Sequence, residues 1–99
     1  SDQGYYKNGT ISILLTKRTL YTNSSKIDVI LAHEFSHHYL NSKLIEMSDP
    51  LAEELFCDFM ASRLVGHKKV FKVLNNKFIS TGSKDTELKS RLEFLEKKY

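Results

Sequence analysis

The sequence His33-Glu34-Phe35-Ser36-His37 has the form H-E-x-x-H, and its surroundings have the pattern of an α-helix. On a helix, two residues four apart project from nearly the same face, with about 6 Å of rise between them. Both imidazoles can therefore reach one metal ion, with Glu34 beside the position of a bound water. The stretch predicts two zinc ligands, His33 and His37, and a candidate general base, Glu34.

The helix that carries this motif is expected over residues 25–41. Ser25 and Asp28 match a capping pattern at its start. One stripe at helical spacing consists of Ile30, His33, His37, Leu40 and Leu44. Because the two histidines share this stripe with apolar side chains, we expect them to point into the fold.

A second helix is expected from Pro50 to Val65. Proline suits the first turn of a helix, and Ser48 or Asp49 can cap it. Gly66 marks its end. The helix is apolar on nearly all sides, which is typical of a central helix.

The second helix also supplies the third ligand that a catalytic zinc needs. Glu54 and Asp58 lie four apart and so share a face. Carboxylates on such an apolar helix are costly to bury unless they are paired or bind a metal. We therefore expect Glu54 to bind zinc and Asp58 to accept a hydrogen bond from a ligand imidazole. Glu53 is the alternative ligand, but its partner at i+4 is Cys57 rather than an acid.

The chain before the motif predicts a β-hairpin over residues 5–16. Asn8-Gly9 is a strong two-residue turn signal. The second strand places Ile11, Ile13 and Leu15 on one face and Thr10, Ser12 and Leu14 on the other. Residues 1–4 show no pattern that indicates a structure or a function.

Two further helices are expected after the second, over about 67–79 and 84–99, with Gly82 in the polar break between them. The last helix has one apolar stripe, made of Leu88, Leu92, Leu95 and Tyr99. Packing of this stripe onto its own domain is the default expectation.

Length and composition restrict the class of protein. The 99 residues make one domain, and 40% hydrophobic and 27% charged residues are typical of a soluble globule. The net charge of +3 comes from scattered lysines, so we expect no nucleic-acid partner. Apolar runs are too short for a membrane span, no signal peptide is recognisable, and the single Cys57 suits a reducing compartment. We expect a soluble cytoplasmic α+β domain over 1–99, with a small β-ribbon packed on about four helices.

The two helical motifs together resemble the gluzincin group of metallopeptidases, whose third zinc ligand is a glutamate on a following helix. The resemblance includes the pattern E-x-x-x-D-x-x-A, here Glu54 to Ala61. The pattern looks like the catalytic core of CAAX-processing and heat-shock membrane peptidases. For a chain without a membrane span it is most similar to the minigluzincins. The resemblance covers roughly residues 10–95 and is specific at the two helical motifs.

This resemblance implies a zincin-like fold and zinc-dependent hydrolysis of a peptide or protein substrate. It implies Zn2+ held by His33, His37 and Glu54, with Glu34 as general base and acid and Asp58 as the support of a ligand imidazole. It also implies that a peptide binds as an added antiparallel strand along the second strand of the hairpin. The substrate-strand residues are then Ile11, Ser12, Ile13 and Leu14.

The chain departs from the membrane relatives near its last helix. Those relatives have a His-Pro pair before that helix and an arginine within it, whereas residues 80–83 contain no histidine. Arg91 is the counterpart of the arginine. The group that stabilises the oxyanion stays open among Arg91, His67 and the tyrosines at 5, 6 and 21.

The C-terminal segment raises a question of regulation. Minigluzincins are described as zymogens held latent by their C-terminal segments, so residues 83–99 are a candidate latency segment. If the last helix covers a neighbour's cleft instead, the resemblance implies a homodimer. The alternative functions are a silent metal-binding regulatory domain and an interaction module with a structural zinc. A structural site would be closed by a fourth protein ligand, for which Cys57 and His38 are the nearest but poorly placed candidates.

Overall fold

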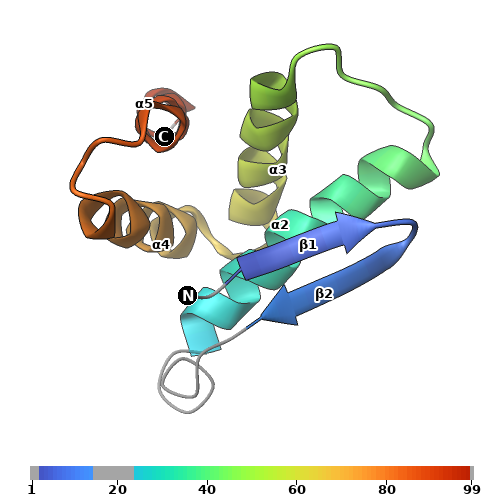
Figure 1. The fold of residues 1–99 in the computed structure, drawn as a ribbon, viewed down its shortest axis with the longest axis horizontal. Helices are drawn as coiled ribbons and strands as arrows, with labels where there is room; N and C mark the ends of the chain where they lie inside the picture. The colour runs from blue at the N-terminus through green and yellow to red at the C-terminus, as the bar shows by residue number, and fades with distance from the viewer. Residues whose placement is uncertain (1–2, 15–23, 99) are drawn as a thin grey trace.

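A small β-ribbon and four helices make up the part of the chain that the computed structural model describes, residues 3–14 and 24–98. The strands are β1 (Gln3–Lys7) and β2 (Thr10–Leu14), and they form an antiparallel two-stranded sheet. The helices are α2 (Ser24–Ser42), α3 (Pro50–Val65), α4 (His67–Ser80) and α5 (Thr86–Lys98) (Figure 1). The predicted α+β class is confirmed for these residues. The radius of gyration of 13.1 Å is close to the value of about 13 Å expected for a folded domain of this length.

The β-ribbon closes at the predicted Asn8-Gly9 turn. Both residues have positive φ angles, 51° and 80°, which match the twist of the two flanking strands. Strand β1 begins at Gln3, two residues earlier than expected, and Leu15 lies outside the described residues. In β2 the predicted alternation is present, with Ile11 and Ile13 half-buried and their neighbours exposed.

Helix α2 crosses beneath the ribbon and ends one residue later than predicted. Ser25 lies inside its first turn rather than capping it, because the helix already includes Ser24. Leu44 does not belong to the inward stripe as predicted. It follows the end of the helix with a φ of 55° and is 89% exposed, because the helical spacing stops at Ser42.

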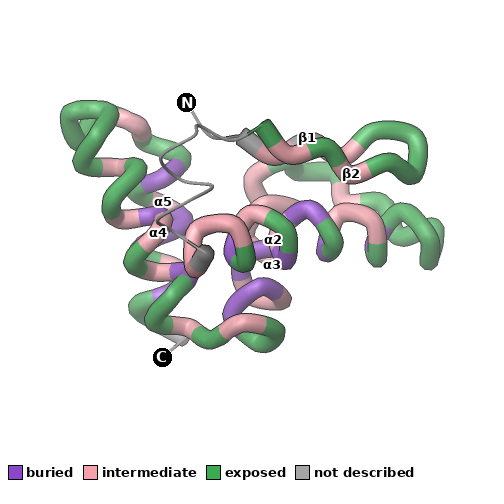
Figure 2. Tube along the Cα trace, turned by 90° about the horizontal axis from the view of Figure 1, so that it is seen from below, coloured by how far each residue is buried: buried purple, intermediate pink, exposed green. Residues whose placement is uncertain are grey.

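Helix α3 is central, as its sequence predicts. Asp49 caps it by accepting a hydrogen bond from the backbone N–H of Leu51, and it ends at Gly66, which has a φ of 104°. Its residues pack against α2, α4 and α5, and Cys57 and Ala61 are fully buried. Figure 2 shows that the buried positions lie where the helices face one another, with the ribbon outside them.

Helix α5 packs onto its own chain, which is the default expectation for its apolar stripe. It begins at Thr86, later than the predicted residue 84, where the side chain of Asp85 accepts a hydrogen bond from the N–H of Leu88. Three leucines of the stripe are buried in the core, namely Leu88, Leu92 and Leu95, while Tyr99 lies outside the described residues. Burial of this stripe therefore requires no second chain. Among the described helices, none is long and apolar enough to cross a membrane.

The burial of α5 predicts that this helix is needed for folding. Leu95→Ala should lower the free energy of unfolding by about 2–5 kcal/mol, because it leaves a cavity at a fully buried site. Denaturant unfolding measures the change, with Glu96→Ala on the exposed face as the control. For the same reason, removing residues 82–99 should unfold the domain rather than uncover an active one. Unchanged stability of Leu95→Ala would contradict this role of α5.

Candidate metal centre

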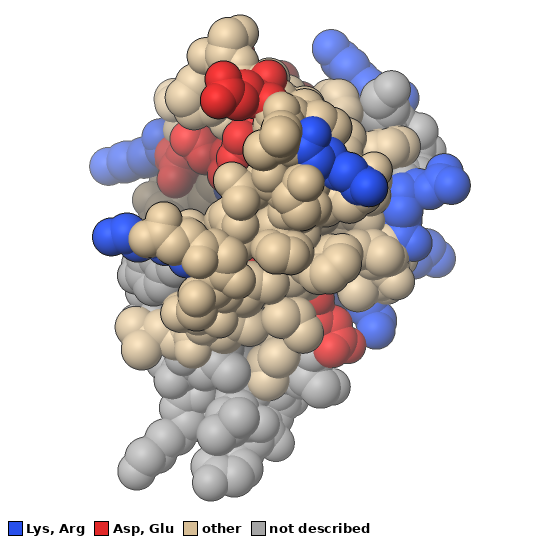
Figure 3. Space-filling view, turned by 90° about the vertical axis from the view of Figure 1, so that its right-hand side faces the viewer, with Lys and Arg blue, Asp and Glu red and all other residues tan. Residues whose placement is uncertain are grey.

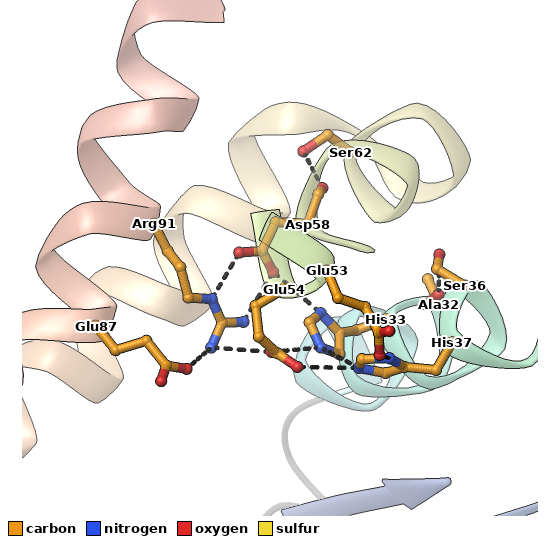
Figure 4. A network of polar contacts seen from close by, with 10 residues as sticks. All are labelled: Ala32, His33, Ser36, His37, Glu53, Glu54, Asp58, Ser62, Glu87 and Arg91. Atoms are coloured by element: carbon orange, nitrogen blue, oxygen red, sulfur yellow. Dashed lines mark hydrogen bonds and ion pairs between the residues drawn. The ribbon is translucent and has the colours of Figure 1, made fainter. Parts of the chain in front are cut away.

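Helices α2 and α3 bring the three predicted zinc ligands together (Figure 4). His33 and His37 project from α2, and their Nε2 atoms lie 3.2 Å apart. Glu54 faces them from α3, with one oxygen 3.0 Å from His33 Nε2 and the other 3.1 Å from His37 Nε2. The side chains of the two histidines are each 13% exposed and that of Glu54 is 26% exposed, so the cluster is largely shielded from water.

The outer nitrogen of each imidazole contacts a second carboxylate. Asp58 Oδ1 lies 3.0 Å from His33 Nδ1, and Glu53 Oε2 lies 2.7 Å from His37 Nδ1. Because an ionised carboxylate only accepts hydrogen bonds, we assign the ring proton to Nδ1 in both histidines. A neutral ring then points an Nε2 lone pair toward Glu54, whereas a protonated ring donates its Nε2–H to Glu54.

The contact predicted between Asp58 and a ligand imidazole is present, and His33 is its partner. The contact of Glu53 was not anticipated, since this residue was considered only as an alternative ligand. Whether a side chain on α3 reaches the inner or the outer nitrogen of an imidazole depends on how α3 crosses α2. No sequence signal distinguishes Glu53 from Glu54 in this respect.

The converging groups fit a tetrahedral zinc. With both rings neutral, two Nε2 lone pairs and a carboxylate held this close repel one another unless a proton or a metal ion lies between them. Ligand atoms at 2.0–2.1 Å from zinc in tetrahedral geometry are about 3.3 Å apart. The observed separations of 3.0, 3.1 and 3.2 Å are near this value. The donor set of two imidazoles and one carboxylate is also the set used in catalytic zinc sites.

Protonation of the histidines provides positive charge when no metal is bound. Burial lowers the pKa of His33, but its contacts with Asp58 and Glu54 outweigh burial and raise this pKa to about 9. Burial alone would raise the pKa of Glu54. Its contacts with His33 and His37 have the larger effect and hold this pKa well below the usual range. At neutral pH a metal must therefore displace a proton from His33, so metal affinity should increase with pH.

Arg91 links Asp58 to the C-terminal helix. Its Nε and Nη2 donate hydrogen bonds to the two oxygens of Asp58 at 2.6 and 2.8 Å. Burial raises the pKa of Asp58, but Arg91 and His33 more than compensate and lower it. Arg91 shares the inward face of α5 with Leu88 and Leu95, three and four residues away. That spacing is a sequence signal for an inward-pointing arginine.

Glu34 lies at the junction of two cavities. It is 7% exposed and lines a cavity of about 510 Å³ together with His33, Glu54 and Arg91. It also lines a cavity of about 610 Å³ together with His37 and Glu53. The predicted general base therefore borders open space next to the ligand cluster.

Strand β1 approaches Glu34 more closely than was expected. Gly4 lines both cavities, and a Cβ atom at this position would lie 2.8 Å from Glu34 Cγ and 2.7 Å from Ile30 Cγ2. Of the predicted substrate-strand residues Ile11, Ser12, Ile13 and Leu14, Ser12 lines the second cavity. Gly4 is thus a residue that sequence analysis missed, since the close approach of a strand backbone to the side chains of a helix leaves no local pattern.

Cys57 lies closer to the histidines than its sequence position suggested. Its sulfur and one nitrogen of each histidine lie within 4.8 Å of one another. Burial and the neighbouring carboxylates raise the pKa of the thiol and so disfavour the thiolate that would bind a metal. His38, the other candidate for a fourth ligand, instead contacts Tyr6, with 3.4 Å between Nδ1 and the hydroxyl oxygen.

The candidates for the group that stabilises the oxyanion differ in which cavity they line. Arg91 lines the first cavity and Tyr6 the second. His67 lies at the start of α4, where its ring contacts Phe71. Tyr21 lies outside the described residues, as does the side chain of Tyr5.

No family model, curated protein or solved structure matches this chain. The resemblance to minigluzincins therefore rests on the two sequence motifs, and the geometry of the site is a separate observation. On the face shown in Figure 3, lysine and arginine side chains are scattered, and aspartate and glutamate side chains lie on the same face. The expected absence of a nucleic-acid partner stays a prediction.

The close approach of β1 to α2 gives a test of Gly4. Gly4→Ala should lower the free energy of unfolding by about 1–3 kcal/mol, because the added methyl overlaps Ile30 and Glu34. Denaturant unfolding measures this effect, and Thr10→Ala on the exposed side of the ribbon is the control. An alanine variant as stable as the unmodified protein would show that β1 does not lie this close to Glu34.

A second test asks whether Glu54 or Cys57 binds the metal. Glu54→Ala should weaken zinc binding strongly, whereas Cys57→Ala should leave it nearly unchanged, since its surroundings disfavour the thiolate. Zinc affinity is measured by competition with a chromogenic chelator. In the Co2+-loaded protein, a thiolate charge-transfer band that disappears in Cys57→Ala would show instead that Cys57 is a ligand.

Proposed function

We propose that this protein is a zinc-dependent metallopeptidase of the gluzincin type, with a zincin-like fold. One observation carries the proposal: the Nε2 atoms of His33 and His37 and the carboxylate of Glu54 converge at 3.0–3.2 Å. Both outer ring nitrogens contact carboxylates, so the converging atoms are all acceptors when the two rings are neutral. A proton on His33 balances the charge of Glu54 when no metal is bound, and a divalent metal can replace that proton.

The position of Glu34 favours a catalytic over a structural role for this metal. A structural zinc is enclosed by four protein ligands, whereas a catalytic zinc keeps one position open for water. Here two imidazoles and one carboxylate supply three ligands. A further carboxylate, Glu34, borders two cavities beside them. This arrangement leaves space for a water and a substrate next to a proton acceptor.

The residues of the chain have distinct roles in peptide hydrolysis. When bound, zinc lowers the pKa of a water and polarises the carbonyl of the scissile bond. Glu34 accepts the proton of the attacking water and delivers it to the leaving amine. Asp58 and Glu53 hold the two imidazoles in the tautomer that exposes Nε2. Arg91 and Tyr6, which line the two different cavities beside Glu34, are the candidates for stabilising charge on the carbonyl oxygen.

The substrate is proposed to be an extended peptide bound along the β-ribbon. Added strands bind through main-chain hydrogen bonds to a free sheet edge. Gly4 and Tyr6 of β1 line the cavities beside Glu34, which favours the edge of β1 as the place where the peptide binds. The expectation from sequence, that Ile11–Leu14 of β2 binds the substrate, stays a prediction, and Ser12 of that strand lines the second cavity.

A structural zinc in a regulatory or interaction domain is the alternative function. The proximity of Cys57 to both histidines favours it, because a thiolate would close the site with a fourth ligand. The cobalt spectrum described above distinguishes the two functions. A thiolate ligand would support the structural site, and its absence supports an open one.

The proposed function predicts that Glu34 is needed for turnover but not for zinc. Glu34→Gln should retain stoichiometric zinc and lose about 100- to 10,000-fold in the rate of peptide cleavage, since an amide cannot accept the proton. Metal analysis and cleavage of an unstructured protein such as casein measure both properties, with Glu93→Gln on the exposed face of α5 as the control. Equal cleavage by Glu34→Gln and the unmodified protein would refute the mechanism.

A further inference from the structure

Arg91 reaches from the C-terminal helix to the carboxylate that orients a proposed zinc ligand. We propose that Arg91 is a positioning residue of the metal centre, and that it makes metal affinity depend on the docking of α5. The inference rests on the proposed zinc site and adds to it a residue and an element outside the two helical motifs. On this view the C-terminal helix supports the site, whereas a latency segment would block it.

The first argument is the geometry of the contact. Arg91 donates to both oxygens of Asp58, at 2.6 and 2.8 Å, which fixes the plane of the carboxylate. Asp58 Oδ1 then lies 3.0 Å from His33 Nδ1. The path from α5 to the proposed ligand imidazole therefore consists of two direct side-chain contacts.

The second argument is burial. Asp58 is 1% exposed and Arg91 is 9% exposed, so neither side chain is oriented by solvent. A carboxylate that loses one partner at such a site is left with an uncompensated buried charge. Without Arg91, Asp58 would have to turn or take up a proton, and both changes alter its hydrogen bond with His33.

The third argument concerns the charges around the ligands. Arg91 Nη1 also lies 3.6 Å from Glu54 Oε2, so the arginine contacts both the supporting carboxylate and the proposed ligand carboxylate. A positive charge here opposes metal binding directly, but it is neutralised by the bidentate contact with Asp58. The loss of orientation of Asp58 and His33 should therefore outweigh the loss of charge repulsion, so removing Arg91 should lower the affinity for zinc.

The link to α5 follows from the shared face of that helix. Arg91 lies between Leu88 and Leu95, which are 2% and 0% exposed in the core. The guanidinium therefore reaches Asp58 only when these leucines are packed. Because coupling between two equilibria is reciprocal, metal binding should also favour the docked helix.

The test compares two substitutions of the full chain. Arg91→Met removes the contact with Asp58, and Lys89→Met makes the same chemical change at an exposed position of α5. Zinc affinity by chelator competition should fall about 10- to 100-fold in Arg91→Met, as for other residues that support metal ligands. The ligand-field spectrum of the Co2+ form should also change, because His33 is no longer held in place. Lys89→Met should alter neither property.

Unchanged or tighter zinc binding by a folded Arg91→Met protein, with an unchanged cobalt spectrum, overturns the inference. Arg91→Lys separates positioning from charge, since lysine keeps the charge but lacks the planar pair of donors. It should bind zinc more weakly than the unmodified protein. If circular dichroism shows Arg91→Met to be unfolded, Arg91→Lys decides by the same criteria. An unmodified protein that binds no zinc overturns the proposed function together with this inference.

Discussion

The carboxylate of Asp58 is the point on which the arrangement of three helices depends. It belongs to α3, accepts two hydrogen bonds from Arg91 of α5, and lies 3.0 Å from the Nδ1 of His33 in α2. A carboxylate that is 1% exposed is stable only if its oxygens are satisfied by the protein. The three helices must therefore meet at the observed angles, or Asp58 is left as an unpaired buried charge (Figure 4).

The C-terminal helix α5 makes two different contributions to this arrangement. Its leucines bury apolar surface and stabilise the core, whereas Arg91 carries a positive charge into a region rich in carboxylates. The helix thus contributes both to the core and to the polar contacts of Asp58. The role expected for residues 83–99 as a latency segment stays a prediction.

Local sequence signals predicted most of the elements because each has a local physical cause. Asn8-Gly9 adopts the positive φ angles of a tight hairpin, and Pro50 and Gly66 bound α3 because one lacks a backbone N–H and the other tolerates φ of 104°. Leu44 was assigned to the inward stripe from its spacing alone, although it lies beyond the predicted end of the helix at residue 41. Because the helix ends at Ser42, Leu44 does not share its face and is 89% exposed.

By itself, the sequence determined the candidate ligands His33, His37 and Glu54, because residues four apart on a helix share a face whatever surrounds them. Only the tertiary structure decided which partner each side chain meets. In the structure Glu53 contacts His37, Arg91 contacts Asp58, and Gly4 lies against the side chain of Glu34. These contacts join segments up to 33 residues apart and depend on helix crossing angles and strand placement. Packing of the whole chain determines those quantities, and no short stretch encodes them.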